Sequence, residues 1–218
     1  MSSPSITSAS GQHASHQPQA APVLLLASAS PRRRELLWQI GVPHAIAIAA
    51  IDERQLAGET PAECVARLAL AKARRVQQGS LPVLGADTAV VVDGDMLGKP
   101  ADRATGLAML ARLAGCTHEV VTAVALVHAR GHDVRLSRSE VRFRAIDEAE
   151  RERYWDSGEG RDKAGGYAIQ QFGAVFISEL RGSYSGVMGL PLFETAALLD
   201  AAGVPRWQQL AAASTGAA

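Results

Sequence analysis

The sequence is short of cysteine and carries no net charge. Its 218 residues include two cysteines, and 22 Lys plus Arg balance 22 Asp plus Glu. Cys64 and Cys116 stand far apart and form no CxxC motif, which favours reduced thiols of a cytosolic protein over a disulfide framework. Because non-specific binding of DNA or RNA needs a basic surface, the neutral balance argues against it. We therefore expect a cytoplasmic protein without a nucleic-acid polymer as partner.

Long apolar runs and targeting signals are also missing. No apolar run reaches the roughly 20 residues that a membrane-spanning helix needs, so we expect no membrane association. Residues 1–21 have almost no large apolar side chain and no secretory signal pattern. We predict a disordered tail over 1–21, in which His13 and His16 are tail histidines rather than metal ligands. A single domain is expected over 22–206, and a short tail over 207–218.

Lysine is rare for a chain with so many basic residues. The chain has only three, Lys72, Lys99 and Lys163, and the other basic residues are arginines. Where Arg serves as the general surface cation, a retained Lys can mark a position that needs a compact ammonium group. Chance could also leave three, so we take this bias only as a pointer to a site.

Helix and strand patterns alternate along the chain. Apolar patterning predicts strands at 23–27, 43–53, 82–92, 118–129, 134–146 and 174–180. Several neighbouring strands are joined by short turns, such as the Asp93–Gly94 hairpin signal. Short turns of this kind favour a mixed sheet over a purely parallel one, and the intervening helices make the chain α/β.

Helix start signals are well defined. Ser30 is a suitable N-cap ahead of a proline, and Thr60 with Glu63 forms a capping box. Asp147 with Glu150 forms a second capping box. Further helices are expected to begin at Asp102 and at Pro191.

The stretch "LLLASASPRRRELL" (24–37) passes from a buried strand to a basic helix start. Such a junction presents free backbone N–H groups and the positive end of a helix dipole. Arg32 and Arg33 are poorly placed for that dipole, and a bound anion would relieve the conflict. The guanidinium fork also suits phosphate. The alternative is a solvated basic patch at the start of a helix.

Asp87 lies inside the apolar strand "VLGADTAVVV". A half-buried carboxylate must find donors, a cation or a proton, so Asp87 could hold a divalent metal or accept a proton from water. The alternative is that it caps a bend beside Gly85. Lys72 lies on the apolar face of its helix, where lysine usually snorkels, and Lys99 lies in a Gly-Lys-Pro turn that is usually plain surface.

Two motifs come close to known catalytic sites and fail. "GSYSG" (182–186) has its serine one place late for a nucleophile elbow. "GEGRDKAGG" (158–166) has Asp162 where a P-loop requires glycine, and Ala164 where it requires Ser or Thr. There is no HExxH motif and no metal-spaced Cys/His cluster. The remaining pattern of arginines, a strand carboxylate and out-of-place lysines suggests a polyanion with a divalent metal, and a nucleoside triphosphate fits.

Seven ordered segments carry a resemblance to a known family. They are "LLLASASPRRRELL", "IDE", "LALAKA", "VLGADTAVVVDGDMLGKP", "GCTHEVVTAVALV", "DKAGGYAIQ" and "GSYSGVMGLPL". From about Val23 to Gly203, the chain resembles the Maf family of nucleoside triphosphate pyrophosphatases. This implies an elongated mixed central sheet flanked by helices, two lobes with a central cleft, and a homodimer. It also implies cleavage between the α and β phosphates with Mg²⁺ or Mn²⁺.

The resemblance also implies a role for each matching residue. Asp87 corresponds to the proton acceptor, and Glu53 would help with metal or water, so Glu53 and Asp87 are the expected metal ligands. Phosphate binding would fall to Ser28, Arg32, Arg33, Lys72 and Lys99. Base selection would fall to Arg32, Thr88 and Gln170.

The expected substrates are dTTP and UTP, with modified pyrimidine nucleotides as further candidates, in a role of nucleotide-pool house-cleaning. "DKAGGYAIQ" resembles the branch acting on these nucleotides, and the Gln170 amide can pair with the O4/N3–H edge of a pyrimidine. Two departures lie near the presumed base pocket: Gln171 stands where glycine is expected, and Gly186 where a larger polar residue is usual. The alternatives are a 7-methyl-GTP pyrophosphatase and a septum-formation regulator that acts by binding.

Overall fold

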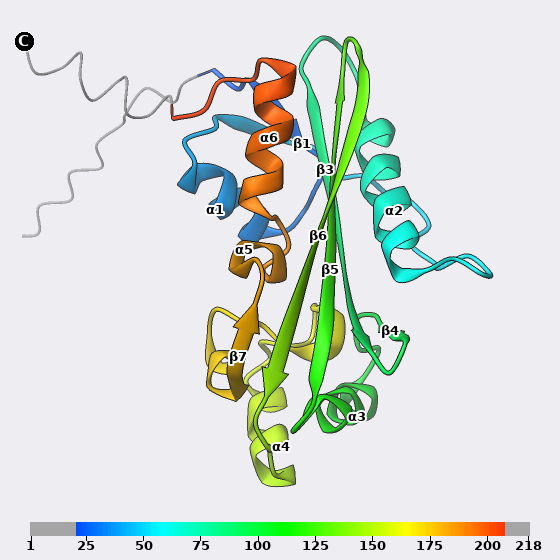
Figure 1. Ribbon diagram of the computed structural model, residues 1–218, viewed down its shortest axis with the longest axis vertical. Coiled ribbons are helices and arrows are strands. Elements are labelled where there is room, and N and C mark those ends of the chain that lie inside the picture. Colours follow the sequence, from blue (N-terminus) through cyan, green and yellow to red (C-terminus); the bar gives the residue numbers. More distant parts are fainter. Residues whose placement is uncertain (1–20, 208–218) are drawn as a thin grey trace, which may run out of the picture.

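Two long antiparallel strands form the spine of the molecule (Figure 1). The computed structural model describes residues 21–207, so the predicted tails lie outside the described residues except for Ala21 and Trp207. β5 and β6 pair along their full length, from Thr117 opposite Arg142 to His128 opposite Gly131. The strands are β1 (Leu24–Leu26), β2 (His44–Ile46), β3 (Val83–Val92), β4 (Asp95–Leu97), β5 (Thr117–His128), β6 (Gly131–Phe143) and β7 (Ile177–Arg181).

The seven strands form one mixed sheet, in the order β2-β1-β3-β5-β6-β7, with β4 paired to β3. β1 is parallel to β2 and β3, and the other pairings are antiparallel. The helices are α1 (Pro31–Gln39), α2 (Pro61–Val76), α3 (Arg103–Leu113), α4 (Glu148–Asp156), α5 (Tyr184–Val187) and α6 (Leu192–Ala202), with 3₁₀ turns η1 (Ala164–Gly166) and η2 (Phe172–Phe176). The predicted mixed α/β fold is confirmed.

The helices gather into two lobes at the two ends of the long strands (Figure 1). In the upper lobe, α1 and α6 pack on one face of the sheet and α2 covers the other. In the lower lobe, α3 and α4 surround a second core. The upper core includes Leu37, Leu84 and Leu199, and the lower core includes Leu110 and Phe143. Each lobe therefore buries its own apolar cluster, and the strands that run through both connect them.

The predicted helix N-caps and capping boxes are confirmed where the side chains involved have no other long-range partner. Thr60 and Glu63 form the predicted capping box, and the Asp102 side chain accepts a hydrogen bond from the Thr105 backbone N–H at 2.8 Å. Ser30 is the N-cap of α1, but its side chain makes no capping bond. Glu150 does not complete the second box, because its carboxylate is paired with Arg144 instead.

Two strand predictions were too long. The strand expected over 43–53 is β2, which ends at Ile46 because its partner β1 is itself only three residues long. Beyond it the chain leaves the sheet, and Ile48 is 71% exposed. The strand expected over 174–180 begins only at Ile177, which is the first residue that finds a partner on β6, opposite Phe143. The residues before it form η2.

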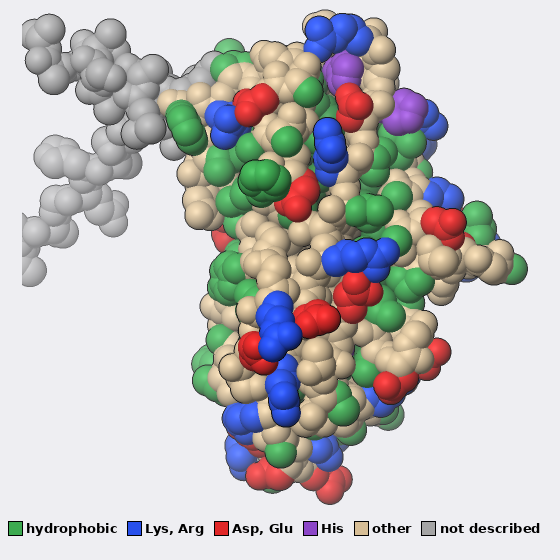
Figure 2. All heavy atoms as spheres, in the orientation of Figure 1, with side chains coloured by type: hydrophobic (Ala, Val, Ile, Leu, Met, Phe, Trp, Pro, Cys, Tyr) green, Lys and Arg blue, Asp and Glu red, His purple; other side chains and the backbone are tan. Residues whose placement is uncertain are grey.

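The visible face of the sheet has no patch of a single charge. Figure 2 shows acidic and basic side chains interspersed over the region of β6 and β7. The exposed ion pairs Arg138–Glu119 and Arg181–Glu179 belong to these strands and their neighbour β5. Within residues 21–207, no helix is both long and apolar enough to cross a membrane. Both cysteines are free thiols, as predicted.

Candidate active site

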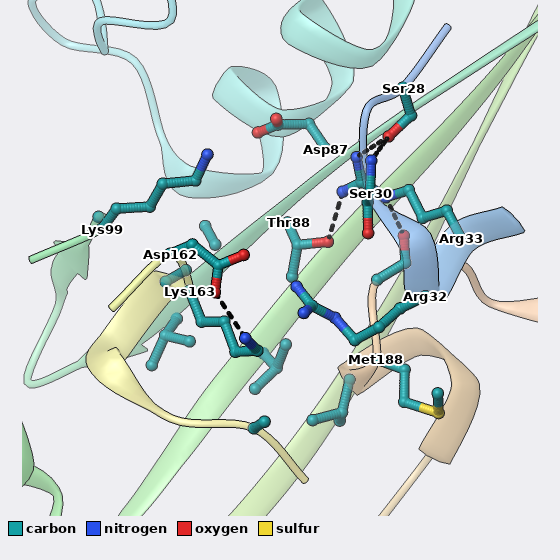
Figure 3. A pocket seen from close by; sticks show the side chains of 18 of the residues that line it. Ser28, Ser30, Arg32, Arg33, Asp87, Thr88, Lys99, Asp162, Lys163 and Met188 are labelled. Carbon is teal, nitrogen blue, oxygen red and sulfur yellow. Dashed lines mark hydrogen bonds and ion pairs between the residues drawn. The ribbon is translucent and has the colours of Figure 1, made fainter. Parts of the chain in front are cut away.

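A cavity of about 590 Å³ lies between the two lobes. Every residue that the sequence assigned to a site lines it: Ser28, Arg32, Arg33, Glu53, Lys72, Asp87, Thr88, Lys99 and Gln170. These residues come from six separate stretches of the chain, and Figure 3 shows labelled members of the set pointing into a common space. The fold thus brings the whole predicted set together.

The cavity opens at a gap along one edge of β3. On that side β3 pairs with β1 only at Val83 and Leu84, and with β4 only from Val90 onward. Within residues 21–207, the stretch 85–89 between them has no partner strand on that side. Successive side chains of a strand point to opposite faces, yet at an open edge both faces are accessible. Asp87 and Thr88 therefore both reach the cavity, from opposite faces of the sheet.

Asp87 lies on the face that α2 covers. α2 approaches β3 closely because Gly85 has no side chain: a Cβ there would lie 2.1 Å from the Ala69 carbonyl oxygen. One turn further along α2, the Lys72 ammonium donates to Asp87 Oδ1 at 2.6 Å. The absence of a side chain at Gly85 therefore allows α2 to come close enough for Lys72 to reach the Asp87 carboxylate. The bend-cap alternative is wrong, because the Asp87 carboxylate is bound by Lys72.

Lys72 also joins a second carboxylate. Its Nζ lies 2.8 Å from Glu53 Oε1, and the Lys72 side chain is only 10% exposed. Burial raises the pKa of Glu53, but the hydrogen bond from Lys72 and the charges of Lys72, Lys99 and Arg33 outweigh it, so that pKa lies below its ordinary value. Lys72 is therefore not a snorkelling side chain. It holds two carboxylates side by side.

Arg33 is held by neutral oxygens on the opposite side of β3. Its guanidinium donates to the Gly189 carbonyl at 2.7 Å, to Thr88 Oγ1 at 3.2 Å and to Ser28 Oγ at 3.4 Å. Thr122 in turn donates to the Gly186 carbonyl and lies 3.1 Å from Thr88 Oγ1. These contacts fix the plane of the guanidinium against β3, the loop before α1 and the segment before α6.

The charge of Arg33 is not neutralised by any carboxylate in direct contact within residues 21–207. Burial lowers the pKa of Arg33, and the nearby charge of Arg32 lowers it further, while the charges of Asp87 and Glu53 oppose the shift. Since the group has five N–H donors and uses three, two are left for a ligand. A solvated basic patch is therefore the wrong interpretation for Arg33.

The cavity as a whole is cationic. Its charged lining comprises five cations, Arg32, Arg33, Lys72, Lys99 and Lys163, and three carboxylates, Glu53, Asp87 and Asp162. This leaves two positive charges in excess, in a chain whose formal net charge is zero. Neither Arg32 nor Lys99 forms an ion pair with any residue in the described part of the chain. A polyanion matches this distribution of charge.

Lys163 and Asp162 are lining residues that the sequence analysis did not assign to the site. The Lys163 ammonium donates to Asp162 Oδ1 at 2.5 Å and to the Glu159 carbonyl at 2.6 Å. The scarcity of lysine was the signal that could have found it, since all three lysines of the chain line this cavity. The same segment also resembles a P-loop, but that resemblance does not identify Lys163 as part of this cavity.

A divalent metal is compatible with the carboxylates. Residues 21–207 contain no group of three or more His, Cys, Asp and Glu side chains able to hold a metal ion. Asp87 and Glu53 nevertheless converge on one point, because both contact Lys72 Nζ. Mg²⁺ is commonly held by one or two carboxylates together with substrate phosphates. The donor set therefore fits a metal that is completed by phosphate oxygens, and does not form a cage of protein ligands.

This chain is similar to known proteins over the residues that form the cavity. A family model for Maf-like proteins matches residues 23–202. A dTTP/UTP pyrophosphatase of Saccharophagus degradans is 53% identical over 194 residues, covering 86% of this chain and 92% of the relative. Proteins of the same name from Alkalilimnicola ehrlichii and Bordetella avium are each 54% identical, over 192 and 194 residues. Both matches cover 84% of this chain, and 95% and 96% of the respective relatives. With a family match over most of its length, the chain belongs to the Maf family.

Proposed function

We propose that this protein hydrolyses nucleoside triphosphates, with dTTP and UTP preferred, to the monophosphate and pyrophosphate. The observation that carries the proposal is the grouping of a strand carboxylate, Asp87, with five cations around one cavity. Relatives that are 53% to 54% identical to this chain over the aligned residues bear the name dTTP/UTP pyrophosphatase. House-cleaning of the nucleotide pool is the role that such an activity would serve.

The cations bind the triphosphate. Arg33 offers two free N–H groups from a fixed plane, and Arg32 lies beside it on the first turn of α1. Lys99 faces the same space from the loop after β4 (Figure 3). In the transition state negative charge grows on the departing pyrophosphate, and these groups stabilise that charge without rearranging.

Asp87 activates the attacking water. The carboxylate accepts a proton from water as the water oxygen forms a bond to the α-phosphorus. The bond between the α-phosphorus and the bridging oxygen breaks, and its electron pair leaves with the pyrophosphate. Lys72 keeps the Asp87 carboxylate oriented through the 2.6 Å hydrogen bond. Substrate binding beside a fixed acceptor makes the attack effectively intramolecular.

Glu53 and Asp87 would hold the divalent cation, Mg²⁺ or Mn²⁺, together with phosphate oxygens of the substrate. When bound, the metal neutralises phosphate charge and polarises the phosphoryl group. The contacts of both carboxylates with Lys72 support this assignment only in that they bring two anionic groups close together.

The base lies toward Gln170, which lines the cavity on the lower lobe. Its amide can donate to O4 and accept from N3–H of thymine or uracil, whereas cytosine presents the reverse pattern. The apolar neighbours Tyr167 and Ile169 line the same part of the cavity. This supports base selection by Gln170 with help from Arg32 and Thr88, although Thr88 is also occupied in holding Arg33.

A panel of nucleotides tests the proposal. Purified protein is incubated with dTTP, UTP, 7-methyl-GTP and ATP in the presence of Mg²⁺ or Mn²⁺, and pyrophosphate and monophosphate are measured. We expect the fastest release from dTTP or UTP, and none without a divalent cation. A faster reaction with 7-methyl-GTP would contradict the substrate assignment. Release of inorganic phosphate in place of pyrophosphate would contradict the reaction. The predicted homodimer is tested separately by sedimentation of the same preparation.

A further inference from the structure

A buried carboxylate lies behind the wall of the cavity. Glu159 follows α4 and is only 8% exposed, and it is not among the residues that line the cavity. Its Oε2 accepts from the Phe172 N–H at 2.8 Å, and its Oε1 accepts from the Gly173 N–H at 3.0 Å. No cation within residues 21–207 forms an ion pair with it. Because burying an unpaired carboxylate is costly, its hydrogen bonds must be well placed.

Tyr154 completes the arrangement from α4. Its hydroxyl donates to Glu159 Oε1 at 2.9 Å and accepts from the Ala168 N–H at 3.0 Å. The ring is anchored in the lower core, where its centroid lies 5.0 Å from that of Phe176. The hydroxyl is therefore fixed by packing, and through it the carboxylate is fixed as well.

These bonds flank one residue on both sides. Ala168 lies two positions before Gln170, and Phe172 lies two positions after it. The loop 168–173 is also closed at its base, since a Cβ on Gly173 would lie 2.4 Å from the Ala168 carbonyl oxygen. Gln170 is thus carried on a short loop that is fastened at both ends to the Tyr154–Glu159 pair.

We propose that Tyr154 and Glu159 are positioning residues for base selection, which they set by holding the backbone that presents Gln170. This inference rests on the proposed function, because it takes Gln170 as the group that meets the base. Amide recognition of a pyrimidine edge needs hydrogen-bond geometry that a small displacement destroys. The assigned phosphate-binding groups lie on the loop before α1, on α1, on α2 and in the loop after β4, and they do not contact this pair. Lys163 contacts only the backbone carbonyl of Glu159, which neither substitution below removes. The pair therefore governs which base is accepted, and not the rate of the chemical step.

Two substitutions remove the hydrogen bonds and preserve the shape. In Glu159→Gln, one acceptor oxygen becomes an NH₂ group that must face a backbone N–H or the Tyr154 hydroxyl. In Tyr154→Phe, the Ala168 N–H loses its acceptor. We expect KM for dTTP to rise about tenfold, with the preference for dTTP over ATP falling by the same factor. The rate of pyrophosphate release from ATP and kcat for dTTP should stay within about twofold of wild type.

Amide hydrogen exchange tests the same idea without any reaction. Glu159→Gln should speed exchange at Phe172 and Gly173, and Tyr154→Phe should speed it at Ala168, each about tenfold or more. Glu152→Gln is the matched control, since Glu152 is a surface carboxylate of the same helix paired with Arg103. It should change neither exchange in this loop nor substrate preference.

Three further results separate the possible failures. Leu113→Val removes one methylene group from the lower core, changes none of the hydrogen bonds to the loop, and should lower the melting temperature with the dTTP preference intact. If Glu159→Gln slows all nucleotides equally, or leaves the preference intact while Gln170→Ala abolishes it, the positioning role is overturned and the proposed function stands. If wild type releases pyrophosphate from no nucleotide, the proposed function fails. In that case, unchanged exchange at the Ala168, Phe172 and Gly173 amides in the variants would show, without any activity measurement, that Tyr154 and Glu159 do not hold the loop.

Discussion

The two lobes contribute polar groups to the cavity in different ways. Around β3, α1 and α2, charged side chains face the open space directly, and Arg33 is the clearest example because its contacts are all with neutral oxygens. In the lower lobe, Asp162 and Lys163 neutralise each other. Gln170 also lines the cavity on this lobe, whereas the buried polar groups Glu159 and His118 lie behind the cavity wall.

The difference teaches how one cavity can treat two parts of a nucleotide. A triphosphate carries several charges, and it is recognised by cations whose charge is left uncompensated until the ligand arrives. A base is neutral and is distinguished by hydrogen-bond geometry, which requires a rigid backbone. In this cavity, charged side chains on the wall suit the triphosphate, and buried hydrogen bonds behind the wall hold the backbone that faces the base.

The largest effect should come from the strand carboxylate. Asp87→Asn keeps the shape of the side chain but removes the proton acceptor, so we expect kcat to fall about 10²- to 10⁴-fold. The measurement is steady-state pyrophosphate release, with a thermal melt to show that the fold persists. A folded Asp87→Asn protein with normal kcat would contradict the catalytic role assigned to the charged part of the cavity.

The second effect concerns the buried network of the lower lobe and depends on pH. Burial lowers the pKa of His118 from its ordinary 6.5 to about 4, and its Nε2 lies 2.8 Å from the Tyr167 hydroxyl. Because the unfolded state binds this proton more readily, stability is complete above about pH 6.5. It is lost progressively as pH falls from about 6.5 to about 4, by up to about 3 kcal/mol in total.

Urea unfolding at pH 7, 6 and 5 measures this dependence. Wild type should lose stability over the series, whereas His118→Gln should lose less, since it has no buried imidazole to charge. His132→Gln, at an exposed position of β6, is the control and should keep the wild-type slope. Equal slopes for all three proteins would show that the lower lobe tolerates a charge at His118.

The third effect tests whether the fixed plane of Arg33 matters as well as its charge. Arg33→Lys keeps the charge but cannot reproduce the three contacts and two free donors, so kcat/KM for dTTP should fall about 10- to 100-fold. Arg34→Lys, the same change at the exposed neighbour, should have almost no effect. Wild-type kcat/KM in Arg33→Lys would mean that only the total charge of α1 counts, and a similar loss in both variants would mean that the effect does not come from the contacts of Arg33.

The smallest effect is expected at Asp162. Its side chain is 70% exposed, and its partner Lys163 is also held by the Glu159 carbonyl. Asp162→Asn should therefore change kcat/KM for dTTP by less than about threefold. A large gain in affinity for dTTP would indicate that Asp162 normally repels the triphosphate, so that both halves of the cavity act on phosphate.

Elements with strong local signals were predicted well from the sequence. The Thr60–Glu63 capping box, the hairpin turn at Asp93–Gly94 and the apolar face carrying Lys72 all depend on residues close together in the chain. The predicted strand ends were less accurate, as at β2 and β7. A strand ends where its partner ends, and apolar alternation carries no information about the partner.

The sequence by itself determined the mixed α/β class, through local helix and strand patterns, and the family, through seven ordered motifs. Through that resemblance it also assigned all the charged residues that line the cavity except Asp162 and Lys163. Only the tertiary structure decided how those residues meet. Arg33 finds the Gly189 carbonyl 156 positions away, and Glu159 finds the backbone on the far side of Gln170. Such contacts depend on how two lobes and an open strand edge pack, and side-chain type and spacing along the chain do not specify them.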